Sequence, residues 1–130
     1  MPVRVTLLPL VLIICLIGGC ASDVSRSETY RHLIGREVCL SEPMVLWRNR
    51  CQPGSLAPYE IEVGMGTYSS HERVAELDTN VPLQVESVKR RHYLIGTPDG
   101  PDDFLIVGLD DPRGSGKVRA EVGLGKVSLE

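Results

Sequence analysis

The sequence predicts an all-β fold, a small and strongly bent antiparallel barrel. Residues 59–63 alternate between apolar and charged side chains, with Tyr59, Ile61 and Val63 on one face, as expected for a half-buried strand. Clusters of Gly, Pro and Asp separate this stretch from several other short apolar stretches. No amphipathic stretch has the length of an ordinary helix, so strands and turns account for the pattern.

The elements follow one another with short turns between them. Residues 30–35 lead into the fold, and residues 71–77 are compatible with a short helix, although seven residues are few for one. Pro82 predicts an edge or a bulge near the start of its strand. The predicted strands are 36–41, 44–49, 59–63, 81–89 with a bent continuation to 96, 103–109, which is apolar on both faces and therefore central, and 117–124.

Alternation also predicts which side chains point inward along these strands. A bulge at Gly125 is expected to shift the parity of the last strand by one residue. The predicted inward set is Val38, Leu40, Tyr59, Ile61, Val63, Val81, Leu83, Val85, Val118, Ala120, Val122, Leu124, Val127 and Leu129.

The first 20 residues have the three parts of a secretory signal: Arg4, an apolar run from Leu7 to Ile17, and two glycines before Cys20. The run would be about 16 Å long as a helix, which is too short to span a bilayer. The stretch Ile17-Gly18-Gly19-Cys20 resembles the lipobox of bacterial lipoproteins.

The lipobox resemblance implies cleavage before Cys20, which then carries a thioether-linked diacylglycerol and an N-acyl chain. Ala21 and Ser22 follow the cysteine in place of the Asp that favours inner-membrane retention, so the resemblance implies the periplasmic face of an outer membrane in a Gram-negative host. An ordinary secretory signal, giving a secreted soluble protein, and an uncleaved anchor are the alternatives. The predicted divisions are a signal peptide over 1–19, the lipidated Cys and a flexible tether over 20–29, and one β domain over 30–130.

Charge and cysteine content limit the partners. Loss of Arg4 with the signal leaves 13 of the 14 basic residues against 17 acids, and this negative balance argues against nucleic acid as a partner.

Cys15 leaves with the signal, so Cys39 and Cys51 remain as a pair in an oxidising compartment, and we expect a disulfide between them. Free buried thiols and a redox or metal pair are the alternatives. No cofactor or metal site is predicted.

The order of the segments resembles SH3-like barrels among small envelope lipoproteins. The resemblance rests on the leading stretch IGREVCL (34–40), a polar loop, NVPLQVESV (80–88) and two closing strands. It is one of pattern and contains no diagnostic motif. An OB-like barrel and an irregular sandwich remain as alternatives.

Two features predict a possible binding surface. Trp47 is the only tryptophan, and with Tyr68 it could anchor a peptide or glycan, although the pattern favours a core position for Trp47. Lys89, Arg90 and Arg91 form a basic run that could meet phosphate groups or an acidic partner. The alternative is that the run is solvated or paired with the surplus acids.

These observations predict a non-enzymatic, membrane-anchored module that binds an envelope protein or the cell wall. No catalytic residue is assigned, because the chain has no G-x-S-x-G motif and His71 lacks a second histidine at zinc-helix spacing. One alternative is a small envelope hydrolase that uses His71 or His92 with a nearby acid. Another is an inhibitor or chaperone-like binder of a secreted enzyme, with residues 52–58 as its contact loop.

Overall fold

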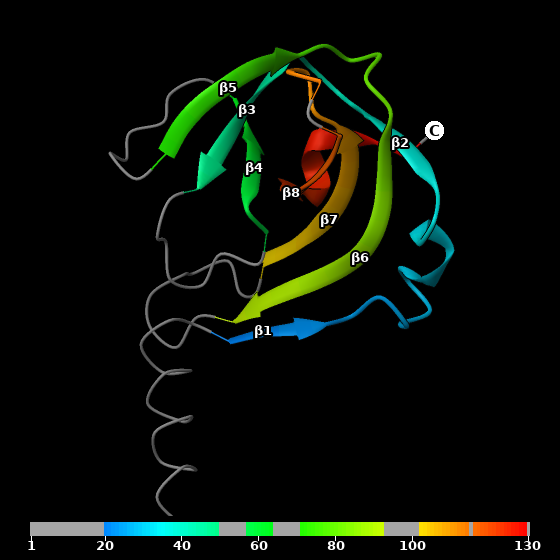
Figure 1. The fold of residues 1–130 in the computed structure, drawn as a ribbon. Helices are drawn as coiled ribbons and strands as arrows, with labels where there is room; N and C mark the ends of the chain where they lie inside the picture. Colours follow the sequence, from blue (N-terminus) through cyan, green and yellow to red (C-terminus); the bar gives the residue numbers. More distant parts are fainter. Residues whose placement is uncertain (1–19, 50–56, 64–70, 93–101, 115, 130) are drawn as a thin grey trace, which may run out of the picture.

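The computed structural model describes residues 20–49, 57–63, 71–92, 102–114 and 116–129 (Figure 1). This part of the chain contains nine strands, two three-residue 3-10 turns and no α-helix, which confirms the all-β prediction. The elements in order are β1 (Cys20–Asp23), η1 (Arg31–Leu33), β2 (Glu37–Leu40), β3 (Met44–Asn49), β4 (Tyr59–Glu62), β5 (His71–Leu77), β6 (Leu83–His92), β7 (Asp102–Asp110), β8 (Lys117–Gly123), η2 (Leu124–Lys126) and β9 (Val127–Ser128).

The nine strands form one curled sheet in the order β5-β3-β4-β8-β7-β6-β2-β9, and β1 also pairs with β6 (Figure 1). All paired strands are antiparallel except β4 and β8, which are parallel. Within the described residues no strand pairing joins β5 to β9, so the sheet is strongly bent but not closed. As predicted, β7 is central, between β6 and β8.

The segment from β2 to β3 runs beside the segment from β5 to β6 through the bend of the sheet. β2 pairs with the start of β6, where Val38 lies opposite Leu83, and β3 pairs with β5, where Met44 lies opposite Leu77. The turns between β2 and β3 and between β5 and β6 therefore lie in the same region. β2 and β3 pair with other strands and not with each other.

The helix considered over residues 71–77 is wrong, since this segment is β5. Seven residues give too few backbone hydrogen bonds for a stable isolated helix, whereas pairing with β3 supplies them from a neighbour. The strand also buries Leu77, whose side chain is 1% exposed.

The core contains most of the residues that alternation predicts. Glu86 lies at a register shift between Val85 and Ser87, and this bulge explains why Val88 also points inward. The buried residues common to the prediction and the structure are Val38, Leu40, Ile61, Leu83, Val85, Ala120, Val122 and Val127, with Tyr59, Val81, Val118 and Leu124 partly buried against them.

Two predictions about inward residues are wrong. Val63 is 51% exposed because β4 ends at Glu62, and Leu129 is 42% exposed because β9 ends at Ser128. Gly125 does not form a bulge inside a strand but lies in η2, which turns the chain from β8 into β9. Strand ends depend on pairing partners, which alternation does not report.

Residues 20–25 are docked on the domain, so the flexible tether predicted over 20–29 is not observed in this part. β1 pairs with the end of β6, and Val24 packs against the core. The Val24 N–H donates to the Val88 carbonyl at 2.9 Å. The Val88 N–H donates to Ser25 Oγ at 2.8 Å, and this hydroxyl donates to the Val88 carbonyl at 3.3 Å. Small polar residues predict flexibility only when no sheet edge is available to pair with them.

The ionisation of the Asp23 carboxylate makes the docking of this segment depend on pH. Hydrogen bonds from Ser25, followed by the interaction with Lys89 Nζ at 3.0 Å, lower the pKa of Asp23 from 3.8 to about 2. A lowered pKa in the folded state stabilises docking above pH 3.8, and this contribution is lost as the pH falls toward 2.

We therefore expect the NMR amide signals of Val24 and Val88 to shift together between pH 4 and pH 2 as β1 detaches. The Asp23→Asn variant serves as the control, because it has no carboxylate to titrate and should show no such coupled transition in this interval. An identical transition in both proteins would contradict the role of Asp23.

Candidate functional site

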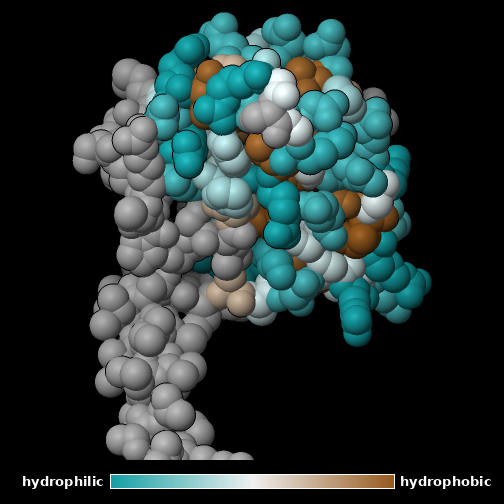
Figure 2. Space-filling view, viewed as in Figure 1, coloured by the Kyte–Doolittle hydropathy of each residue, from teal (hydrophilic) through white to brown (hydrophobic). Residues whose placement is uncertain are grey.

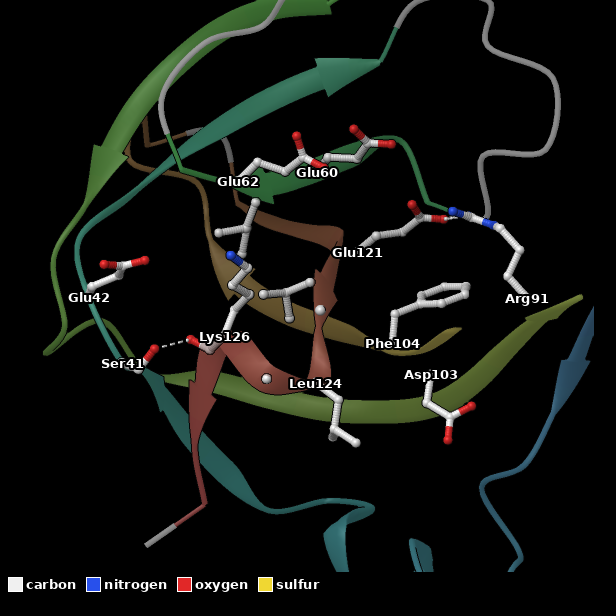
Figure 3. Close-up of a pocket in the computed structure, with 14 residues that line it drawn as sticks. Ser41, Glu42, Glu60, Glu62, Arg91, Asp103, Phe104, Glu121, Leu124 and Lys126 are labelled. Atoms are coloured by element: carbon white, nitrogen blue, oxygen red, sulfur yellow. Dashed lines mark hydrogen bonds and ion pairs between the residues drawn. The ribbon is translucent and has the colours of Figure 1, made fainter. Parts of the chain in front are cut away.

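The described surface contains a cleft where two parallel strands separate. β4 and β8 pair only at Tyr59–Ala120 and Glu60–Glu121. Beyond these pairs β8 turns into η2, and a cavity of about 500 Å³ lies beside the separation (Figure 3). Its lining residues are Ser41, Glu42, Glu60, Ile61, Glu62, Arg91, Asp103, Phe104, Glu121, Val122, Gly123, Leu124, Gly125 and Lys126.

Backbone contacts hold the two ends of the cleft in place. At one end the Ser41 N–H and hydroxyl both donate to the Lys126 carbonyl, each at 2.9 Å, which fastens η2 to the turn before β3. At the other end Phe104 lies opposite Gly123 in the β7–β8 pairing. The cleft is thus framed by regular sheet pairing and by a turn that is hydrogen-bonded to it.

The charged side chains of the lining are mostly acidic. Figure 3 shows Glu60 and Glu62 on β4, across the cavity from Phe104 and Leu124. The full charged lining consists of five carboxylates, Glu42, Glu60, Glu62, Asp103 and Glu121, and two cations, Arg91 and Lys126. Asp103 and Glu121 already pair with Arg90 and Arg91, and with Arg90 included five carboxylates still outnumber three cations. This remaining excess of negative charge in a concave surface favours positively charged groups.

Arg91 shows how a cation fits in this cleft. Its guanidinium carbon lies 4.7 Å from the centre of the Phe104 ring, and its Nη2 lies 3.3 Å from Glu121 Oε1. Phe104 is 6% exposed and Glu121 is 7% exposed. An aromatic face beside a buried carboxylate attracts a guanidinium through both cation–π and ionic interactions.

A second ion pair, between Arg90 and Asp103, lies where β6 ends and β7 begins. Arg90 donates to both oxygens of Asp103, with Nε to Oδ1 at 2.7 Å and a terminal nitrogen to Oδ2 at 3.1 Å. The Tyr30 hydroxyl donates to the same carboxylate. This hydrogen bond, followed by burial, raises the pKa of Tyr30, so the hydroxyl stays protonated as a donor.

The predicted basic run is paired with acids. Lys89 contacts Asp23, and Arg90 and Arg91 contact Asp103 and Glu121 respectively. The structure thus places these residues in three separate ion pairs, of which only that of Arg91 has both members in the cleft lining. The run carries little net charge once its partners are included.

The predicted aromatic surface is only partly described. Trp47 is half-buried on β3, opposite Glu60 of β4 and Arg73 of β5. Since Leu46 and its partner in β4 are buried in the core, alternation places Trp47 and Glu60 on the outer face. Tyr68 lies outside the described residues.

Hydrophilic residues cover most of the face shown in Figure 2, where the hydrophobic areas are small and separated. Among the described residues, the large apolar side chains that are exposed are Ile34, Val63 and Leu129. Ile34 directly follows η1, Val63 follows β4 and Leu129 follows β9, so the three come from separate parts of the chain. The polar cleft is therefore a better candidate for a binding surface than an apolar patch.

The remaining predicted site residues are located as follows. Cys39 is half-buried on β2, opposite Ser128, whereas Cys51 lies outside the described residues, so the disulfide stays a prediction. The backbones of Cys20, His71 and His92 are in β1, β5 and β6, and their side chains lie outside the described part. Among the described side chains, no group of three or more His, Cys, Asp or Glu residues is placed to hold a metal ion.

The sequence did not single out the cleft. Alternation placed Glu60 and Glu62 on the outer face, but Glu121 joins them only through the parallel pairing of β4 and β8. No local signal identifies a pairing between residues this far apart in the chain.

Comparison of the chain with protein-family models, with curated proteins and with solved structures finds no match. Within the described ranges, no helix has the length and apolar character needed to cross a membrane.

Proposed function

We propose that this chain is a membrane-anchored envelope lipoprotein whose β domain is a non-enzymatic binding module for an envelope protein or the cell wall. The lipobox-like Ile17-Gly18-Gly19-Cys20 supports the anchor, and Ala21 and Ser22 support the periplasmic face of an outer membrane in a Gram-negative host. Several acyl chains would make this attachment stable, where a single chain gives marginal binding.

The proposal includes an SH3-like arrangement of the domain. The leading stretch of the resemblance contains β2, and its second stretch contains the first half of β6. β7 and β8 then follow as antiparallel neighbours, in agreement with two closing strands. The separation of β4 from β8 gives this arrangement its cleft.

The observation that carries the binding function is the acidic cleft beside Phe104. Its carboxylates outnumber its cations, and the contacts of Arg91 demonstrate the chemistry that the lining accepts. A partner segment rich in Arg or Lys is complementary to this surface. We therefore propose that the module binds a basic segment of its partner.

A peptide-binding measurement tests this proposal. We expect a fluorescent Arg-Ser repeat peptide to bind the domain, and the matched Glu-Ser peptide not to bind. Changing Glu60 and Glu62 together to Gln should weaken binding about three- to tenfold, because rim charges contribute modestly and are screened by salt. Fluorescence anisotropy at low and physiological ionic strength measures both effects.

The double variant Glu28→Gln/Glu37→Gln is the matched control, because it removes two exposed carboxylates outside the cleft lining. It should leave the affinity for the basic peptide unchanged. Equal weakening by this control and by the cleft variant would mean that net charge, and not the cleft, determines binding. Crosslinking in intact cells, followed by recovery of the complex, would then identify the natural partner.

The alternatives lack support from the described residues. The hydrolase alternative relies on His71 or His92, whose side chains lie outside the described part. Residues 52–56 of the proposed inhibitory loop lie outside the described part, and Ala57 is 5% exposed. Neither alternative gains an observation comparable to the cleft.

A further inference from the structure

We infer that β1 fixes the domain directly on the bilayer surface and holds the acidic cleft at the level of the lipid headgroups. The inference rests on the proposed lipidation of Cys20. It goes further because it sets the height and orientation of the domain, and because it limits the partner to segments that lie at the membrane surface.

The residue proposed to carry the lipid belongs to the sheet. Cys20 is the first residue of β1 and pairs with His92, the last residue of β6. The pairing continues residue by residue to Asp23 opposite Lys89, where a 3.0 Å ion pair joins the two side chains. The hydrogen bonds between Val88 and the residues after β1 extend this attachment.

The docked β1 differs from a flexible tether in the distance that it leaves between the lipid and the domain. A flexible segment of ten residues, as predicted for 20–29, would separate its ends by about 18 Å on average and would allow free rotation. In the docked arrangement, paired strands lie only about 5 Å apart, so the lipid-bearing backbone is in contact with the domain. The lipid is therefore attached at the end of the sheet, and no flexible linker separates it from the domain.

One end of the cleft lies near the proposed lipid attachment. Arg91, which lines the cleft, is the cross-strand partner of Ala21, the residue that follows Cys20. Standard backbone spacings put the Arg91 and Cys20 Cα atoms within about 10 Å of each other. Phe104 and Asp103, also in the lining, lie on β7 beside the same end of β6. The cleft thus begins beside the anchor.

The charges beside β1 do not determine the orientation of the domain on the membrane. The cations that adjoin β1 are Lys89, Arg90 and Arg91, and each contacts a carboxylate. These pairs leave no excess positive charge to attract anionic lipids. Strand pairing and the lipid, and not headgroup charge, determine the orientation, so we expect it to change little with salt or with the anionic lipid content.

The experiment uses the full lipidated protein in vesicles of phosphatidylethanolamine and phosphatidylglycerol that contain dansyl-labelled lipid. The double variant Asp23→Asn/Ser25→Ala removes the side-chain contacts that hold β1 and leaves Ala21 and Ser22 unchanged. Glu28→Gln, in the same segment, is the control. Flotation measures anchoring, hydrogen exchange of residues 20–25 measures docking, and energy transfer from Trp47, the only tryptophan, measures the height of the domain.

We expect all three proteins to float with the vesicles. In the wild type and the control, residues 20–25 should be protected from exchange; in the double variant, protection should fall roughly tenfold or more. Transfer from Trp47 to dansyl should fall in the double variant alone, and to a similar extent in vesicles without phosphatidylglycerol.

The outcomes separate the two proposals. Normal flotation with unprotected residues 20–25 in the wild type, or with transfer that the double variant does not alter, would overturn the docking inference and leave the anchor intact. Absence of flotation by the wild type would instead overturn the proposed lipoprotein function on which the inference depends.

Discussion

The Cys20→Ala variant is expected to lose all incorporation of labelled fatty acid and to retain residues 1–19. The thioether to diacylglycerol requires the sulfur of Cys20, and the proposed processing cleaves the chain only after this modification. In the lipobox resemblance no other residue can substitute for the cysteine. Metabolic labelling with a palmitate analogue and the intact mass of the purified protein measure the two effects.

Cys39→Ala is the matched control for this prediction, since it removes a sulfur from β2 and leaves the proposed lipidation residue unchanged. It should be labelled and cleaved as the wild type is. Mature, membrane-bound Cys20→Ala protein of the same N-terminus as the wild type would refute lipidation. Loss of label in both variants would point to a general failure of export.

The Leu46→Ala variant is expected to lower the free energy of unfolding by about 2–5 kcal/mol. Leu46 is 0% exposed in β3, where it lies opposite Ile61 of β4 and Ala75 of β5. Truncation removes buried methyl groups and leaves a cavity that paired strands on both sides can fill only in part. For a domain of this size, such a loss is a large share of the total stability.

Urea denaturation of the domain measures this change as a lower midpoint with an unchanged slope. Val63→Ala is the control, because Val63 is 51% exposed, and it should change the free energy of unfolding by less than about 0.5 kcal/mol. Equal destabilisation by both substitutions would show that β3 is not at the centre of the core.

The strand formed by residues 59–62 shows what local pattern can predict. Its alternation correctly put Ile61 inside and Glu60 and Glu62 outside, because neighbouring side chains of any strand point to opposite faces. The same reasoning identified the central position of residues 103–109, since a strand that is apolar on both faces must be covered on both. These conclusions depend only on residues next to one another in the chain.

Residues 71–77 and 20–29 show where this reasoning fails. The first segment is β5 and not a short helix, and the second is docked by β1 and not a flexible tether. In both segments the local sequence only weakly favours one backbone conformation. A free edge of β3 or β6 supplies the backbone hydrogen bonds that decide the conformation.

The sequence by itself determined the all-β class, the positions of most strands and turns, and the acidic balance of the chain. These properties follow from local periodicity and composition. Only the tertiary structure decided that Glu121 lies beside Glu60, that β4 and β8 separate to form a cleft, and that acids pair with the run at Lys89–Arg91. Those features join residues far apart in the chain, and they depend on the order and register of the strands. The same alternating segments are compatible with many orders and registers, so alternation alone does not select one.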